Sequence, residues 1–261
     1  MAIKLTFLGT GTSQGVPMIG CGCEVCCSAD AKDKRLRASV LVEVDGAKIV
    51  VDAGPDFRQQ MLRAKVANVD AILLTHNHKD HTGGLDDIRA FNYHEKRATR
   101  IYCEKYVEDS LRMEYSYAFA EVKYPGAPEW NVNIIDDQPF EIPSKDGSKT
   151  IRIIPIRGRH FKLPVLGYRF GNIAYCTDMN YIADEEFEKL QGLEHFIINC
   201  VRRGRHISHF SIEQAIAVAE KVGAKHSWLT HLSHQLPCHE ELCTELPPHI
   251  RPAYDGLIIE A

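Results

Sequence analysis

The chain has 261 residues, of which 44% are hydrophobic and 25% are charged, and its formal net charge is −4. These proportions are those of a soluble globular protein with enough apolar residues for a packed core. The slightly acidic balance excludes an overall basic field of the kind that many nucleic-acid-binding proteins carry. No apolar run is long enough to span a membrane, and residues 1–9 alternate like a strand, unlike a signal peptide. We expect a cytoplasmic protein with a single domain over residues 1–261.

The first expected strand, residues 3–7, leads into a glycine-rich loop at residues 9–15 with the sequence Gly-Thr-Gly-Thr-Ser-Gln-Gly. The backbone N–H groups of such a loop can bind a phosphate group. No lysine follows at the spacing of a nucleotide-binding P-loop, so we favour a tight turn between strands.

Three cysteines, Cys21, Cys23 and Cys26, lie within six residues. Thiolates separated by one or two residues can chelate zinc at tetrahedral angles. In a cytosolic chain, the nine cysteines indicate free thiols and metal ligands rather than a disulfide framework. A cluster of free thiols is the alternative. A closed zinc site needs a fourth ligand from another part of the chain, and the adjacent Cys27 would point away from it.

Two strands over residues 38–44 and 48–51 are expected to form a hairpin through Asp45-Gly46. The second strand ends at Asp52, whose carboxylate can orient a metal-bound histidine through the other ring N–H. Capping of a turn is an equally good interpretation of Asp52. Residues 56–64 then form an amphipathic helix with Phe57, Met61 and Leu62 facing inward.

The densest group of potential metal ligands is Thr75-His76-Asn77-His78-Lys79-Asp80-His81. It follows an apolar strand at residues 71–74 and precedes a turn and a helix, and α/β folds place ligand sites at such strand ends. Residues two apart in an extended segment point the same way, so His76 and His78 can bind one ion. Asp80 and His81 can reach a second ion. Imidazole and carboxylate ligands suit zinc, manganese or iron.

Other expected strands end in the same type of residue. His160 follows the strand of residues 151–156, Asp178 follows the hairpin of residues 167–176, and His231 follows the strand of residues 227–230. His234 lies three residues after His231 and is our candidate for the fourth ligand of the cysteine group. Residues 254–260 are expected to form the last strand.

A polar segment at residues 202–211 precedes a helix for which Ser211 is the expected N-cap. His209 lies just before this cap, where its side chain can project into a cleft. The loop also carries Arg202, Arg203 and Arg205, which can bind an anionic substrate or simply face solvent. Arg89, eight residues after His81, has the same two interpretations: contact with a substrate phosphate or a solvated helix arginine.

The sequence His76-x-His78-x-Asp80-His81 resembles the signature of the metallo-β-lactamase superfamily of metal-dependent hydrolases. The resemblance covers nearly the whole chain and implies an αββα sandwich of two mixed β-sheets flanked by helices. It implies that His76, His78 and His160 bind one metal ion, that Asp80, His81 and His231 bind another, and that Asp178 bridges them. The cysteines, His234 and His209 together resemble the phosphoribosyl cyclic phosphodiesterase family of the carbon–phosphorus lyase pathway. There the equivalent of His209 serves as a general acid or base.

We therefore expect a phosphodiesterase with two active-site zinc or manganese ions and one structural zinc, hydrolysing a small cyclic phosphodiester through a metal-bridging hydroxide. His209, when protonated, would donate to the leaving alkoxide. The alternatives are a tRNA 3′-end-type endoribonuclease, a thioester or other hydrolase of the same superfamily, and a non-catalytic metal-binding scaffold. A long basic arm for tRNA is not evident, so we do not expect nucleic acid as a partner. A homodimer is the default assembly.

Overall fold

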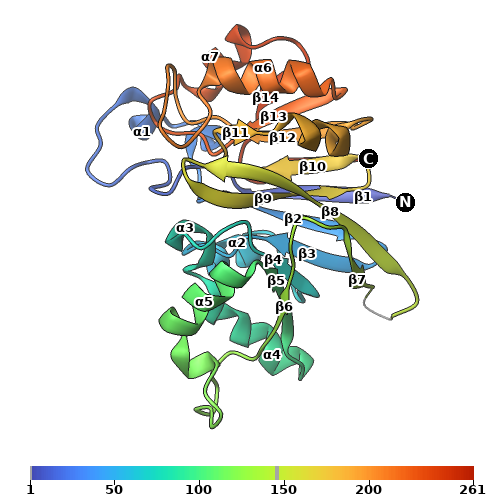
Figure 1. Cartoon of the computed structure of the whole chain (residues 1–261). Helices are drawn as coiled ribbons and strands as arrows, with labels where there is room; N and C mark the ends of the chain where they lie inside the picture. Colours follow the sequence, from blue (N-terminus) through green and yellow to red (C-terminus); the bar gives the residue numbers. More distant parts are fainter. Residues whose placement is uncertain (1, 145–146) are drawn as a thin grey trace.

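Two β-sheets lie face to face, with helices on both outer sides (Figure 1). The computed structural model describes residues 2–144 and 147–261. None of the helices in these two segments has the length and apolarity needed to cross a bilayer.

The first sheet contains seven of the described strands, in the spatial order β15 (Ile258–Glu260), β1 (Ile3–Gly9), β2 (Ser39–Val44), β3 (Ala47–Val51), β4 (Ala71–Leu73), β5 (Thr99–Cys103) and β6 (Trp130–Ile134). The second contains eight, in the order β11 (Tyr181–Ile182), β8 (Thr150–His160), β9 (Leu163–Phe170), β10 (Ile173–Cys176), β12 (His195–Asn199), β13 (His226–Thr230) and β14 (Ile250–Pro252), with β7 (Phe140–Pro143) pairing to β8. Both sheets are mixed. Pairing is antiparallel at the hairpins β2–β3 and β8–β9, and parallel from β3 to β6 and from β12 to β14.

Helices cover the outer face of each sheet (Figure 1). The first sheet packs against α2 (Phe57–Arg63), α4 (Arg89–Glu95), α5 (Lys105–Glu114) and the 3₁₀ helices η2 (Leu85–Ile88) and η3 (Ser116–Ala118). The short helix α3 (Lys79–Thr82) follows β4. The second packs against α6 (Ile212–Val222), α7 (His239–Glu245) and the 3₁₀ helix η4 (Asp184–Leu190). The segment between β1 and β2 carries α1 (Glu24–Cys27) and the 3₁₀ helix η1 (Ala31–Asp33).

The apolar residues form three main clusters that match these layers. One lies between the two sheets and contains Phe7, Val42, Tyr168 and Tyr175. The other two lie between each sheet and its helices. Burial of the apolar faces between layers is what holds such an architecture together. The predicted αββα sandwich is thus confirmed.

Several local predictions are also confirmed. Asp45 and Gly46 have φ angles of 47° and 78°, which are the positive values that a tight hairpin turn requires. Ser211 caps α6 through a capping box in which its side chain accepts from the N–H of Gln214. These signals are local in the sequence, so they hold without knowledge of the tertiary fold.

Two predictions need correction. Leu62 was expected to face inward, yet it is 62% exposed, because the short helix α2 presents only the stripe containing Phe57 and Met61 to the sheet. The last strand was expected to begin near Tyr254 and begins only at Ile258. The preceding Asp255 instead accepts hydrogen bonds from the Leu36 N–H and the Thr10 hydroxyl group.

Candidate metal centre

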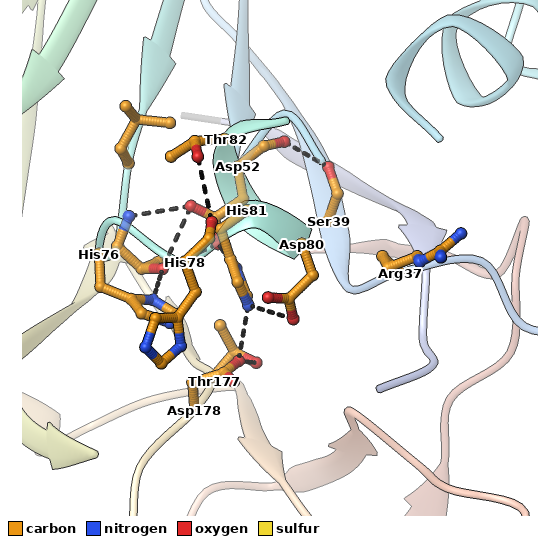
Figure 2. A network of polar contacts seen from close by, with 12 residues as sticks. Arg37, Ser39, Asp52, His76, His78, Asp80, His81, Thr82, Thr177 and Asp178 are labelled. Carbon is orange, nitrogen blue, oxygen red and sulfur yellow. Dashed lines mark hydrogen bonds and ion pairs between the residues drawn. The ribbon is translucent and has the colours of Figure 1, made fainter. Parts of the chain in front are cut away.

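The strand ends of both sheets bring the predicted ligands together at one edge of the sandwich. Asp52 follows β3, the histidine motif follows β4, His160 ends β8, Asp178 follows β10 and His231 follows β13. Figure 2 shows His76, His78, Asp80, His81 and Asp178 gathered around one space, with Asp52 in contact with His81. The site is therefore built between the two sheets, and neither sheet supplies it alone.

Three of these strand-end residues have left-handed backbone conformations. The φ angles are 65° for Asp52, 57° for Asp178 and 55° for His231. Each such angle costs a residue with a side chain on the order of 1–3 kcal/mol and is found mainly where function requires it. The reversal at the end of each strand turns a polar side chain into the space between the sheets.

The ring of His81 is held from behind by Asp52. Asp52 Oδ2 lies 2.7 Å from His81 Nδ1, and the Thr75 N–H and hydroxyl group both donate to the Asp52 carboxylate at 2.9 Å. All three residues are fully buried. A neutral ring with its proton on Nδ1, toward Asp52, presents the lone pair of Nε2 to the centre. This is the contact that an orienting role for Asp52 requires.

One set of potential ligands surrounds that lone pair. His81 Nε2 lies 3.2 Å from Asp80 Oδ2 and 3.3 Å from Asp178 Oδ2, and His231 Nε2 lies 3.0 Å from Asp178 Oδ1. The ligand atoms of Asp80, His81, Asp178 and His231 all lie within 4.8 Å of one another. These four residues are the set predicted for one metal ion together with its bridging carboxylate.

The second predicted set is arranged more loosely. The rings of His76, His78 and His160 are neighbours, with centroids 4.5 to 5.6 Å apart. Among the described residues, however, the ligand atoms that lie within 4.8 Å of one another beside these rings belong to His160, Asp178 and His209. His209, predicted only for proton transfer, thus also lies at the distance of a ligand.

The chemistry of the buried side chains fits a divalent cation. His76 Nε2, His160 Nδ1 and His209 Nδ1 are buried without a hydrogen-bond partner, although buried polar atoms almost always have one. Burial by itself would raise the pKa of Asp178, but His231 and His81 together hold that pKa well below its usual range. An ionised carboxylate faced by unpaired imidazole nitrogens is the ligand set that zinc or manganese prefers.

Burial, with a further contribution from nearby His231, lowers the pKa of His209 to about 2. The neutral imidazole is therefore the favoured form of His209 in the free protein. Its Nδ1 lies 3.8 Å from Asp178 Oδ1, and its ring lies 4.5 Å from that of His160 and 4.6 Å from that of His231.

The cysteine group forms a separate cluster. The ligand atoms of Cys21, Cys23, Cys26 and His234 lie within 4.8 Å of one another, and His234 Nδ1 is 3.3 Å from Cys21 Sγ and 3.4 Å from Cys23 Sγ. The N–H of Cys26, followed by His234, lowers the pKa of Cys23 to about 6, so its thiolate forms readily. Cys27 is an exposed free thiol outside this group.

The glycine-rich loop of residues 9–15 forms both a turn and a wall of the site. The Gly15 N–H donates to the Thr12 carbonyl at 2.9 Å, which confirms the predicted turn. Thr12, Ser13 and Gln14 also line a cavity of about 220 Å³ together with His206, His209 and His231. The loop therefore faces the candidate metal centre.

Two supporting residues were not predicted. Asn199, at the end of β12, accepts from the Met179 N–H at 2.7 Å and donates to the Met179 carbonyl at 2.9 Å, so it fixes the backbone next to Asp178. Gly54 lets the segment after Asp52 approach the motif, since a Cβ there would lie 1.9 Å from the Asp80 carbonyl oxygen. Asn199 could have been found from the sequence, because it is a polar residue at the end of an apolar strand.

Arg89 lies outside this arrangement. Its side chain is 55% exposed and pairs with Asp86 at 3.2 Å. A substrate contact by Arg89 remains a prediction without a supporting contact. Arg202 and Arg205 instead line a second cavity beside the centre, with His206.

Comparison with known proteins decides the family. The model of the β-lactamase superfamily domain matches residues 47–232, which includes every strand-end residue of the centre. The chain belongs to the metallo-β-lactamase superfamily of hydrolases. This result confirms the resemblance seen in the motifs.

Within the superfamily, the chain is PhnP-like. It is 38% identical to a crystal structure described as a new diphosphatase from the PhnP family, with a TM-score of 0.92, covering 100% of this chain and 98% of that one. The zinc-bound PqqB of Methylobacterium extorquens shares the fold, with 18% identity and a TM-score of 0.76 over 98% of this chain and 99% of that one. A protein with this fold therefore binds zinc.

A longer relative is the octanoyltransferase of Porphyromonas gingivalis, 45% identical over 258 residues, which are 98% of this chain and 51% of that protein. The PQQ synthesis protein B of Methylobacterium nodulans is 34% identical over 116 residues, covering 39% of each protein. The chain thus spans about half the length of the octanoyltransferase, and its alignment covers less of the other relative. The name octanoyltransferase describes that whole protein, of which this chain matches 51%.

Proposed function

We propose that this protein is a metal-dependent phosphodiesterase that hydrolyses small phosphodiesters, cyclic ones among them. The observation that carries the proposal is the pair of ligand clusters that share Asp178. The full-length similarity to a PhnP-family diphosphatase supports chemistry at phosphorus.

Two divalent ions, zinc or manganese, would be held by His76, His78 and His160 on one side and by Asp80, His81 and His231 on the other, with Asp178 between them. Bound there, the ions would supply the Lewis acidity that lowers the pKa of an attacking water and offsets negative charge on phosphate oxygens. The position of Asp178 supports this division, because its carboxylate groups both with Asp80, His81 and His231 and with His160 and His209.

Asp52 and His209 have different tasks in this scheme. Asp52 accepts from His81 Nδ1 and holds the ring in one orientation and one tautomer. His209 lines the cavity beside His231 and moves a proton. In the free protein its low pKa makes it a weak base, and the negative charge of a bound phosphodiester would raise that pKa toward the range in which His209 can accept a proton and donate it to the leaving alkoxide.

The cysteine cluster would hold one structural zinc. Three of its residues come from the segment before β2, and His234 comes from the segment after β13. A zinc ion there would tie these distant segments together beside the cavity wall formed by Thr12, Ser13 and Gln14.

The test is hydrolysis of a substrate panel by zinc- or manganese-loaded protein. The panel contains ribose 1,2-cyclic phosphate, a 2′,3′-cyclic nucleotide, bis(p-nitrophenyl) phosphate, a P–O–P diester, precursor tRNA and an acyl thioester. We expect the small phosphodiesters to be hydrolysed. Loss of a positioned acid or base costs about 10²–10⁴-fold, so His209→Ala should lose this much activity while its metal content stays unchanged.

His249→Ala is the matched control, because the His249 side chain is 38% exposed and pairs with Glu220 rather than with a residue of the centre. Turnover of precursor tRNA alone would replace the proposal with an endoribonuclease, and turnover of the thioester alone with an acyl hydrolase. A fully metal-loaded protein that hydrolyses nothing in the panel would overturn the proposal in favour of a binding scaffold.

A further inference from the structure

A second cavity, of about 490 Å³, adjoins the candidate metal centre. It is lined by Phe161, Asn180, Arg202, Arg205, His206 and Ile207. His206 also lines the smaller cavity that contains His209 and His231, so the two cavities share a wall. A substrate with its phosphorus at the metal centre can therefore extend into this second cavity, which we call the side cleft.

The walls of the side cleft are fixed by Asn180, two residues after Asp178. The Phe161 N–H donates to Asn180 Oδ1 at 3.0 Å, and Asn180 Nδ2 donates to the Ile207 carbonyl at 2.9 Å. Phe161 directly follows His160 and has a φ of 58°. A left-handed conformation is unusual for phenylalanine and persists only where surrounding contacts impose it. One amide side chain thus joins both walls of the cleft to the loop of the metal centre.

Large apolar side chains at the cleft remain open to solvent. Phe161 is 51% exposed and Ile207 is 65% exposed. An aromatic face beside a flexible aliphatic side chain is suited to a planar group, and stacking on an aromatic ring is how proteins commonly bind a nucleobase.

The same cleft carries positive charge without compensation. Arg202 and Arg205 form no ion pair with an acidic side chain in residues 2–144 and 147–261, whereas the neighbouring Arg203 pairs with Glu245. Arg202 Nη2 donates to the Arg205 carbonyl at 3.0 Å, and Arg202 Nε is buried without a partner. Guanidinium groups match the geometry of phosphate oxygens, so the cleft is suited to an anion.

We propose that the side cleft binds a nucleoside 5′-phosphate group, so that the substrates of this enzyme include small diphosphate diesters of nucleosides. The base would stack on Phe161 and contact Ile207, and the phosphate that does not react would lie against Arg202 and Arg205. This proposal rests on the proposed hydrolysis at phosphorus. In the reaction, the oxygen of water forms the new P–O bond and the bridging oxygen leaves with the nucleoside monophosphate. Side chains or solvent take both water protons.

The first test is calorimetric binding of AMP, adenosine and ribose 5-phosphate to zinc-loaded protein, since binding does not depend on turnover. Removal of a stacking ring weakens binding of a base by about 10-fold or more. Phe161→Ala should therefore weaken the binding of AMP and of adenosine by about this factor, and the affinity for ribose 5-phosphate should stay within twofold. Phe161→Trp should retain AMP binding. Tyr93→Ala is the control for loss of an exposed aromatic ring, since Tyr93 is 70% exposed and lies on α4.

The second test separates the charge from the base. Loss of a hydrogen bond to a charged group costs about 10-fold in affinity, so Arg205→Ala should weaken AMP by this factor and leave adenosine unchanged. Arg203→Ala should change neither, because Arg203 is in the same loop but pairs with Glu245. Metal content, measured for every variant, must stay at the wild-type value.

AMP that binds no better than ribose 5-phosphate, or equally well to wild type and Phe161→Ala, would overturn the inference. Turnover of ribose 1,2-cyclic phosphate separates a failure of this inference from a failure of the proposed function. Hydrolysis of that ester without Phe161-dependent AMP binding would leave a phosphodiesterase whose side cleft does not bind a base. Phe161- and Arg205-dependent AMP binding without any hydrolysis would remove the phosphodiesterase and leave a nucleotide-binding site.

Discussion

The histidine–carboxylate centre and the cysteine cluster both hold metal-ligand side chains, but the fold supports them differently. The centre lies at the strand ends of two packed sheets, and His76, His81, Asp178 and His231 are all buried. The three cysteines of the other cluster lie in the segment between β1 and β2, where Cys26 packs with Val16 and Val25 in a small apolar group, and His234 follows β13.

This difference indicates what holds each ligand in place. In the centre, hydrogen bonds such as those from Thr75 and His81 to Asp52 orient the side chains before any ion binds. In the cysteine cluster, α1 has only four residues, and few apolar side chains pack around it. A metal ion bound there would contribute directly to the stability of the fold, because it would join segments that otherwise share little packing.

The largest loss of hydrolytic activity should come from Asp178→Ala, which removes the carboxylate that both ligand sets share. We expect hydrolysis to fall by about 10³-fold or more and the protein to retain fewer than two ions in the centre, because the charge stabilisation at phosphorus depends on both. Steady-state kinetics with metal analysis would measure this. Near-normal activity with full metal content would show that the shared carboxylate is not needed.

The next effect should come from Asp52→Asn, which keeps the shape of the side chain but removes its charge behind His81. We expect zinc affinity of the centre to fall by about 10–100-fold, the usual effect of losing such a supporting contact. Competition with a zinc chelator would measure it. Asp70→Asn is the control, because Asp70 is also buried at 0% exposure but binds the Lys48 N–H and Arg97 instead. Equal affinity in both variants would contradict the orienting role of Asp52.

A smaller effect on activity is expected from Cys23→Ser. This variant should lose one zinc ion per chain, and its melting temperature should fall by several degrees, at about 2–4 °C for each kcal/mol lost. Hydrolysis should change less than tenfold, because the centre is held by the sheets. Cys27→Ser should match wild type in all three measurements, since Cys27 is exposed and outside the cluster. Loss of activity equal to that of Asp178→Ala would mean that the two clusters are not independent.

The smallest effect is expected from Arg89→Ala. An exposed ion pair such as that of Arg89 with Asp86 contributes about 0–1 kcal/mol to stability, and Arg89 makes no contact with the centre. Hydrolysis should stay within twofold of wild type. A rise in KM of tenfold or more for the small phosphodiesters would restore the predicted phosphate contact.

The sequence by itself determined the fold class and the residues that supply the centre. Period-two alternation and continuous apolar runs marked the strands, and several strands were followed by a residue such as Asp52, His160 or Asp178. The order and spacing of these residues resemble the metallo-β-lactamase motifs, and this resemblance predicted both the αββα sandwich and a shared site. The three cysteines were close enough in sequence to predict one cluster.

Only the tertiary structure decided how these side chains face one another. The left-handed turns at Asp52, Asp178 and His231, the support from Asn199 and the position of His209 beside His160 depend on contacts between distant strands. The side cleft likewise forms because Asn180 joins Phe161 to Ile207, residues that lie 46 positions apart in the sequence. Local patterns carry no information about such pairs, since the packing of one sheet on the other sets the distances between them.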